Sequence, residues 1–477
     1  MPGAGAVSAP VGPSATTVTP ASTASRRNAE LGLLVFALAV ALAAFATLGL
    51  GVDGAVPARI GSYAAGFGGL LLVAHLALRR FAPYADPVLL PAVALLNGIG
   101  LVMIYRLDIA EAASAERAGR PAPAPDALSQ ITWTALGVVL FVAVLVLVRD
   151  HRGLQRFTYT AMAAGLVLLL LPLVPGLGTR IFGAQIWIRV GPFSFQPGEV
   201  AKIALTIFFA GYLVLKRDVL ALARRRVLGV DLPRMRDLGP IVVVWLVCLG
   251  ILVFERDLGT AVLFFGSFVM LLYVATERRS WLILGTLMVL AGGWLAYQAF
   301  AHVRTRIDIW LDPFADPQGA GFQLVQGLYG LAAGGLLGSG LGQGRPDLIP
   351  VAKTDFIVDA LGEELGLTGL MALLLLYGIV VERGLRTAIA ARDSFGTLLA
   401  AGLSFILAIQ VFVVVGGVTR LIPLTGLTTP FLSYGGSSLV ANWALVALLL
   451  RISDAARRPA PPPVPETQEA LTQVVRR

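Results

Sequence analysis

Long apolar runs recur along the chain, and they constrain its fold more than any other feature. We identify twelve runs long enough to cross a membrane, since about 20 helical residues span the hydrocarbon core of a bilayer. They lie near 31–52, 59–78, 86–105, 128–148, 158–177, 199–215, 238–255, 257–276, 280–302, 357–381, 394–416 and 430–450. A composition of 57% hydrophobic and 14% charged residues excludes a soluble globular protein. We therefore expect an all-α, polytopic membrane protein with about twelve transmembrane helices.

Basic residues alternate between the loops that join these runs. The basic loops are marked, in chain order, by Arg79, Arg149, Lys216, Arg278, Arg383 and Arg451. By the positive-inside rule, these loops and both termini are expected in the cytoplasm. The outward loops are then 106–127, 178–198, 303–356 and 417–429. The net charge of +9 is mainly a topology signal with some attraction to anionic lipids, and arginines scattered over short loops do not favour a nucleic-acid partner.

The two ends of the chain differ from its apolar part. Residues 1–28 are rich in Ala, Pro, Ser and Thr, and 456–477 is rich in Pro, so both are expected to be disordered cytoplasmic tails. Two apolar runs within 29–82 follow the first tail, and the remaining runs occupy 83–455.

Four carboxylates gather in Val351–Gly366, in a chain that otherwise keeps charge out of its apolar runs. Asp355 lies at the start of the predicted tenth helix, Asp359 one turn later, and Glu363 and Glu364 farther in. Asp355 could simply cap the helix. Capping does not explain the two glutamates, which need polar partners inside the bundle. The segment is the first candidate for chemistry.

The outward loop 303–356 is too long and too rich in glycine to be a simple linker. Ten glycines lie between Gly319 and Gly344, and the moderately apolar 322–341 could be a re-entrant or interfacial segment. Arg304 and Arg306 could clamp a pyrophosphate, because guanidinium groups match phosphate oxygens. They could equally be interfacial arginines whose charged ends reach water.

A second cluster lies at the start of the sixth run, in Gln196–Lys202. Glu199 could complement the helix dipole and pair with Lys202 three residues on, or the two could hold a phosphate or relay a proton. Arg189 lies in the same outward loop. Asp257, at another outward helix start, is well explained as an N-cap.

Several motifs occur in a fixed order over roughly residues 86–455. They are FQPGEVAK at 195–202, DLGT at 257–260, LDPFADPQGAGFQLVQ at 311–326, the glycine-rich 334–342, the acidic 354–366 and PFLSYGGS at 430–437. Together they resemble the SEDS family (shape, elongation, division and sporulation), the RodA/FtsW peptidoglycan glycan-chain polymerases, and most closely its actinobacterial RodA members. The resemblance implies a ten-helix core at 83–455, preceded by two extra helices and interrupted by the extracytoplasmic loop 303–356 between helices nine and ten.

The resemblance also implies an activity, the polymerisation of lipid II into glycan strands at the outer face of the cytoplasmic membrane, for elongation or division. Asp355 would be the general base in an inverting transfer from a pyrophosphate-linked donor. Arg304, Arg306 and Lys202 would offset the pyrophosphate charge, helped by Arg189, since the arginine of the family motif GAQRW is replaced by Ile186.

Other residues and partners follow from the same resemblance. Glu199, Asp257, Glu363, Glu364 and Ser433 would support the site. A divalent cation, Mg or Mn, could share the charge, whereas no organic cofactor is implied. The expected partner is a class B penicillin-binding protein, a transpeptidase that cross-links the new strands. The alternatives are a flippase for lipid II or another lipid-linked sugar, which intramembrane carboxylates would also suit, and a non-catalytic scaffold, which would leave the acidic cluster unexplained.

Overall fold

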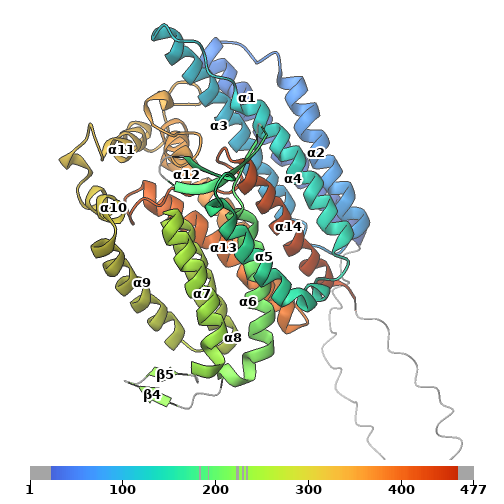
Figure 1. Ribbon diagram of the computed structural model, residues 1–477. Helices are drawn as coiled ribbons and strands as arrows, with labels where there is room; N and C mark the ends of the chain where they lie inside the picture. Colours follow the sequence, from blue (N-terminus) through green and yellow to red (C-terminus); the bar gives the residue numbers. More distant parts are fainter. Residues whose placement is uncertain are drawn as a thin grey trace, which may run out of the picture.

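The computed structural model is a bundle of long helices (Figure 1). It describes residues 23–459 except 182–183, 192, 222–224, 228–229 and 233–234. Most of both predicted tails lies outside these residues. The first helix begins at Thr23, so that 23–28, expected in the first tail, are helical.

A helix occupies each of the twelve predicted spans. In chain order these are α1 (Thr23–Asp53), α2 (Ile60–Phe81), α3 (Leu89–Arg117), α4 (Asp126–Leu147), α5 (Thr158–Leu170), α6 (Gly198–Ala221), α7 (Met235–Glu255), α8 (Leu258–Thr276), α9 (Ser280–Ala299), α12 (Ile357–Ala390), α13 (Ser394–Val418) and α14 (Gly436–Arg457). Within the described residues, eleven segments are long and apolar enough to cross a membrane. The all-α, polytopic fold is confirmed.

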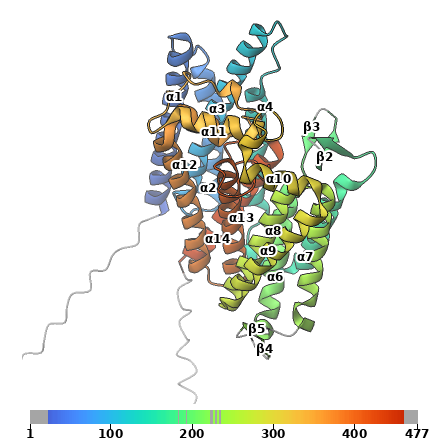
Figure 2. The same ribbon diagram turned by 90° about the vertical axis from the view of Figure 1, so that its left-hand side faces the viewer.

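The predicted loop 303–356 contains helices of its own. They are α10 (Ala301–Leu311) and α11 (Phe322–Gly334), with one-turn helices at Pro313–Ala315 and Pro346–Leu348. Figure 2 shows α11 lying across one end of the bundle. We call this the α11 end; it carries α10, α11 and residues 335–356. The apolar segment predicted at 322–341 is therefore a short helix followed by a glycine-rich loop.

Short strands lie in two of the connections. The strands β1 (Gly178–Ile181), β2 (Ala184–Val190) and β3 (Phe193–Phe195) form an antiparallel sheet in which Arg189 pairs with Ser194. A second hairpin joins β4 (Arg225–Val227) to β5 (Val230–Leu232). Both are small additions to the bundle.

The bundle is organised around α14, α3 and α13, which are largely buried, whereas α9 is mostly exposed and apolar. Trp443 of α14 lies at the centre, where its ring meets Phe141 and Phe431 edge to face and its indole N–H donates to the Asn97 side chain at 3.3 Å. Gly137 of α4 makes this packing possible, since a Cβ there would overlap the Trp443 ring. An apolar outer surface suits contact with lipid tails.

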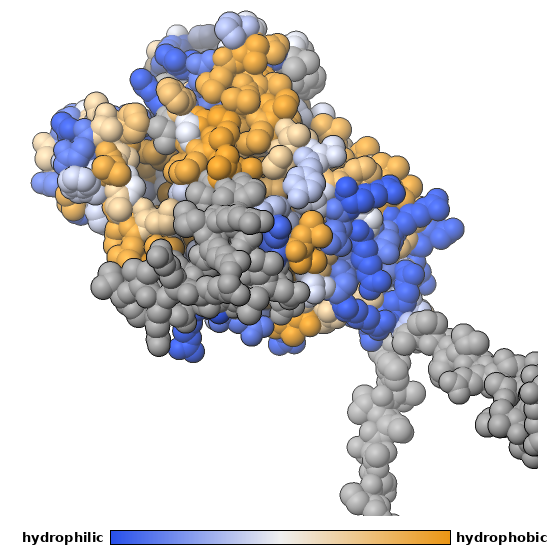
Figure 3. Space-filling view, turned by 60° about the horizontal axis from the view of Figure 1, so that its bottom comes forward, coloured by the Kyte–Doolittle hydropathy of each residue, from blue (hydrophilic) through white to orange (hydrophobic). Residues whose placement is uncertain are grey.

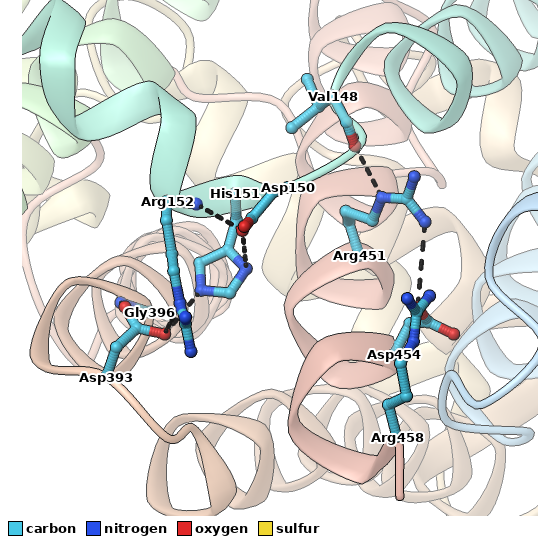
Figure 4. Close-up of polar contacts among 9 residues, drawn as sticks. All are labelled: Val148, Asp150, His151, Arg152, Asp393, Gly396, Arg451, Asp454 and Arg458. Atoms are coloured by element: carbon cyan, nitrogen blue, oxygen red, sulfur yellow. Dashed lines mark hydrogen bonds and ion pairs between the residues drawn. The ribbon is translucent and has the colours of Figure 1, made fainter. Parts of the chain in front are cut away.

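The opposite end of the bundle, the basic end, exposes Arg79, Arg80, Arg149 and Arg152. Figure 3 shows hydrophilic atoms gathered there beside apolar helix sides. The connections at this end are held by charged side chains. His151 Nε2 lies 2.9 Å from the carboxylate of Asp393, which also caps α13, as Figure 4 shows.

Arg451 reaches across the same end from α14. Its Nε donates to the carbonyl oxygen of Val148 at 2.6 Å (Figure 4), and its Nη2 donates to that of Leu145 at 3.2 Å. These carbonyls belong to the last turn of α4 and have no partner within the helix. Arg451 therefore caps α4 and ties it to α14.

Helix α12 is broken at Gly366, whose φ of 67° and ψ of −173° are not helical. Leu367 and Thr368 donate their backbone N–H groups to the carbonyls of Gly335 and Leu336, so the break is filled by the loop that follows α11. The break separates a short first part, 357–365, from the long remainder of α12. Glu363 and Glu364 lie in this first part, at the α11 end.

Candidate active site

Asp355 lies in a turn immediately before α12, at the α11 end. The turn is held from the side by the loop before α14: the Ser433 hydroxyl donates to the carbonyl oxygen of Thr354 at 2.6 Å, and the Tyr434 N–H donates to that of Lys353 at 2.7 Å. Burial raises the pKa of Asp355 to about 6, although the Thr354 hydroxyl and Arg306 oppose the shift. A carboxylate with a pKa near neutrality suits proton transfer.

Arg306 of α10 faces Asp355 across Gly426. Its Nη1 donates to the carbonyl oxygens of Leu424 at 3.3 Å and Thr425 at 3.1 Å. Gly426 has a φ of +76°, and a Cβ placed on it would lie 3.6 Å from Asp355 Oδ2 and 3.9 Å from Arg306 Nη2. The glycine therefore keeps open the space between a carboxylate and a guanidinium.

Asp257 also lies near Arg306. Its carboxylate accepts the N–H of Thr260 at 2.9 Å, which confirms the predicted N-cap of α8. Burial raises the pKa of Asp257, while the Thr260 hydrogen bond and the charge of Arg306 lower it. Glu199 is a further neighbour, and its negative charge raises the pKa of Asp257.

Glu199 and Lys202 form the predicted pair in the first turns of α6, with 2.5 Å between Lys202 Nζ and Glu199 Oε2. Lys202 is buried, and its Nζ also lies 3.1 Å from the side-chain oxygens of both Gln410 and Asn442. A buried ammonium ion requires such partners. Three acidic and two basic side chains from four segments thus come together at the α11 end: Asp355, Asp257, Glu199, Arg306 and Lys202.

The structure does not bring Arg304 into this cluster. Arg304 is exposed on another side of α10, over the ring of Tyr297 with 5.4 Å from the guanidinium to the ring centre. Residues two apart on a helix point in nearly opposite directions. A two-arginine clamp formed by Arg304 and Arg306 is therefore not seen. Arg189 is exposed on β2, and within the described residues no hydrogen bond or ion pair joins it to Asp355.

Lys353 is a further residue of the site region, and the sequence did not single it out. Its buried Nζ lies 2.7 Å from Asp108, 2.7 Å from Glu111 and 2.8 Å from Asp126. These carboxylates come from the end of α3 and the start of α4, more than 200 residues earlier. Only the folded chain reveals the cluster. The position of Lys353, two residues before Asp355, is a weak signal in the sequence that Lys353 belongs to the site region.

Glu363 and Glu364 have the polar partners expected of buried carboxylates. Glu364 accepts from Arg106 Nε of α3 at 2.7 Å and from the Gly342 N–H at 3.0 Å. Glu363 accepts the Arg345 N–H at 2.6 Å. Both glutamates therefore hold the loop that follows α11.

Asp359 differs from the two glutamates. It is buried, and neither of its carboxylate oxygens has a hydrogen-bond partner among the residues that the structure describes. No role follows from its position.

A divalent cation is not supported by these side chains. Within the part of the chain that the structure describes, no group of three or more His, Cys, Asp or Glu residues is arranged to hold a metal ion. The carboxylates near Asp355 are instead matched with Arg306, Lys202 and the N–H of Thr260.

Known proteins share both the sequence and the fold. The peptidoglycan glycosyltransferase RodA of Mycobacterium tuberculosis is 54% identical over 436 residues, covering 91% of this chain and 92% of the relative. RodA of Mycobacterium leprae is 51% identical over 444 residues, covering 93% of each. A solved structure described as a peptidoglycan synthase complex that coordinates polymerization and crosslinking matches with a TM-score of 0.60 and 26% identity, over 79% of this chain and 99% of that one.

The family model of the FtsW, RodA and SpoVE proteins, described as cell cycle proteins, matches residues 87–458. This range begins just before α3 and ends with α14, so it holds every residue of the cluster around Asp355. The chain belongs to the FtsW/RodA/SpoVE family.

Proposed function

We propose that this protein is a peptidoglycan glycosyltransferase that polymerises lipid II, with Asp355 as the general base. The observation that carries the proposal is a carboxylate of pKa about 6 facing the guanidinium of Arg306 across the space kept open by Gly426. The names of the mycobacterial relatives support the reaction class.

In the proposed reaction, a carboxylate oxygen of Asp355 takes the proton of the acceptor 4-hydroxyl. The hydroxyl oxygen attacks the anomeric carbon of the donor, and the bond from that carbon to the pyrophosphate oxygen breaks. The electron pair leaves with the lipid pyrophosphate, and a single displacement inverts the anomeric centre. One base suffices, since pyrophosphate is already a good leaving group.

Arg306 offsets the negative charge that develops on the pyrophosphate. Its only hydrogen-bond partners among the described residues are the backbone carbonyls of Leu424 and Thr425, so its positive charge is not consumed by a direct ion pair. A fixed cation at the point where charge develops lowers the barrier without reorganisation. Lys202 acts at longer range, since Glu199 already neutralises it.

We further propose that the α11 end faces outward and the basic end faces the cytoplasm. The exposed arginines of the basic end, among them Arg79, Arg80 and Arg149, support this orientation through the positive-inside rule. A class B penicillin-binding protein is the proposed partner, supported by the similarity to a synthase complex.

A lipid flippase is the alternative function. It is less well supported, because the charged cluster lies at one end of the bundle instead of midway along the spans, where alternating access needs its site. The two functions differ in their product, which is either a polymer or a translocated lipid.

The test is synthesis of glycan chains by the purified protein with its partner on lipid II, followed by gel analysis. Asp355→Asn should abolish chain synthesis, whereas Asp308→Asn, which changes an exposed carboxylate on α10, should leave it at the wild-type level. Chain synthesis by Asp355→Asn at the wild-type level would refute the assignment of Asp355 as the general base. Translocation of labelled lipid II in vesicles, without synthesis in the presence of the partner, would favour the flippase.

A further inference from the structure

The helices α1 and α2 precede the residues matched by the family model, yet both are built into the bundle. At the basic end, Glu30 of α1 pairs with Arg27 and lies 2.8 Å from His75 Nδ1 of α2, and Arg27 also donates to the carbonyl oxygen of Ala85. All three side chains are buried. Buried charges are tolerated only when they are paired, so this network fixes one end of the two helices.

The other end of α1 is fixed by aromatic packing. The Phe45 ring stacks on Tyr63 of α2 and meets Tyr105 of α3 edge to face, each with 5.1 Å between ring centres. Leu48 and Val102 complete a small core of their own at this point. The last turn of α1 is therefore held at the α11 end.

That last turn touches the glycine-rich loop directly. A Cβ on Gly51 would overlap the carbonyl oxygen of Leu341, and a Cβ on Gly342 would lie 2.9 Å from both the carbonyl oxygen of Leu48 and Cγ2 of Val52. Such distances are too short for real Cβ contacts, so the approach of the two backbones requires glycine on both sides. Figure 2 shows α1 and the segment that contains α11 at the same end of the bundle.

The same loop holds the first part of α12. Gly342 donates its N–H to the Glu364 carboxylate at 3.0 Å, and the N–H groups of Ser339 and Gly340 donate to the carbonyl oxygens of Glu363 at 2.9 Å and Glu364 at 3.0 Å. Because α12 is broken at Gly366, these contacts help to hold the orientation of 357–365 from outside the helix. Asp355 lies two residues before that segment.

We propose that α1 and α2 form a brace that positions Asp355 through the glycine-rich loop 338–344. The path runs from Gly51 to Leu341 and Gly342, from there to Glu364, and along 357–365 to Asp355. The two helices thus contribute to the reaction without supplying a residue to the cluster around Asp355. The proposal rests on the proposed role of Asp355.

The test compares Gly51→Ala with Gly61→Ala. Both glycines are helical and near the α11 end, but a Cβ on Gly61 meets nothing within 4 Å. Val52→Ala is a milder second variant, since it removes Cγ2 from Gly342 without introducing a clash. All are made in the full chain, purified with its partner, and hydrogen exchange of 338–344 is measured beside the rate of chain synthesis from lipid II.

We expect faster exchange of 338–344 in Gly51→Ala and Val52→Ala, with kcat about tenfold lower in Gly51→Ala, because small misplacements of a catalytic group are costly. The acid limb of the pH profile should also move to lower pH, as Asp355 becomes better hydrated. A loss of global stability alone would not move that limb to lower pH. Gly61→Ala should match the wild type in all three measurements.

Two results would overturn the brace. One is exchange and rates for Gly51→Ala and Val52→Ala equal to those of Gly61→Ala. The other is faster exchange with unchanged kcat and pH profile, which would mean that the loop is held but does not position the base. Failure of the proposed function would be seen in a different experiment. Chain synthesis by Asp355→Asn would refute the proposed base, regardless of how fast the amides of 338–344 exchange.

Discussion

The pH dependence of chain synthesis is the most direct test of the proposed base. Asp355 must be ionised to accept a proton, and burial raises its pKa from 3.8 to about 6. A raised pKa means that the carboxyl is neutral below about pH 6 and ionised above it. The rate of synthesis should therefore rise with pH through this region.

The magnitude follows from the titration of one group. With a pKa of about 6, the ionised fraction of Asp355 falls about tenfold from pH 7 to pH 5. With the ordinary value of 3.8, the same step would lower it by less than about a tenth. Arg306 is one cause that lowers this pKa, so Arg306→Gln should move the acid limb to higher pH.

The assay measures kcat/KM for lipid II between pH 5 and pH 8, since this quantity reports groups of the free enzyme. Thermal unfolding at each pH serves as the control for loss of the folded protein. A rate that is constant from pH 5 to pH 7 would refute the perturbed base. If the acid limb of Arg306→Gln lies at the same pH as that of the wild type, the electrostatic coupling between Arg306 and Asp355 is refuted.

Three further predictions concern the surroundings of the base. Arg306→Ala should raise KM for lipid II or lower kcat by about tenfold or more, while Arg304→Ala on the same helix should change neither. Equal effects of the two substitutions in gel-based kinetics would contradict the different roles that their placement predicts. Lys353→Met should lower the free energy of unfolding by about 2 kcal/mol, because it leaves Asp108 buried without its cation, and Lys353→Arg should recover part of the loss. Denaturant unfolding that shows no difference between the two variants would mean that the ion pairs of Lys353 do not stabilise the fold. Gly426→Ala should cost about 1 kcal/mol for its positive φ and also reduce synthesis by filling the space beside the base. Gly119→Ala, at positive φ with open space around it, should show only the stability cost, and comparable synthesis by the two variants would show that the space is not used.

The helices were predictable because each span is long and apolar enough to stand out by itself. The positions of Glu199 and Lys202 followed from helical spacing, and Asp257 from the position of a helix start. These are local relations, fixed by residues within one turn of each other. Local periodicity is the most reliable signal in a single sequence.

The arginine pair shows where local reasoning failed. Read as a loop, 303–356 allowed Arg304 and Arg306 to point the same way. The structure has α10 there, and helical geometry separates them. Lys353 was missed for a different reason: its three carboxylates come from α3 and α4, and nothing in the spacing along the chain indicates that these segments meet.

The two cations near Asp355 are distinguished by their partners and not by their charge. Lys202 is buried against Glu199, Gln410 and Asn442, so moving it toward a substrate would leave Glu199 buried without its partner. Arg306 donates to two backbone carbonyls and lies beside the space that Gly426 keeps open. A pyrophosphate entering that space would gain an attraction to Arg306 without breaking an existing ion pair. In the proposed reaction, Arg306 is therefore the cation that can respond to the developing charge, whereas Lys202 links α6 to α13 and α14.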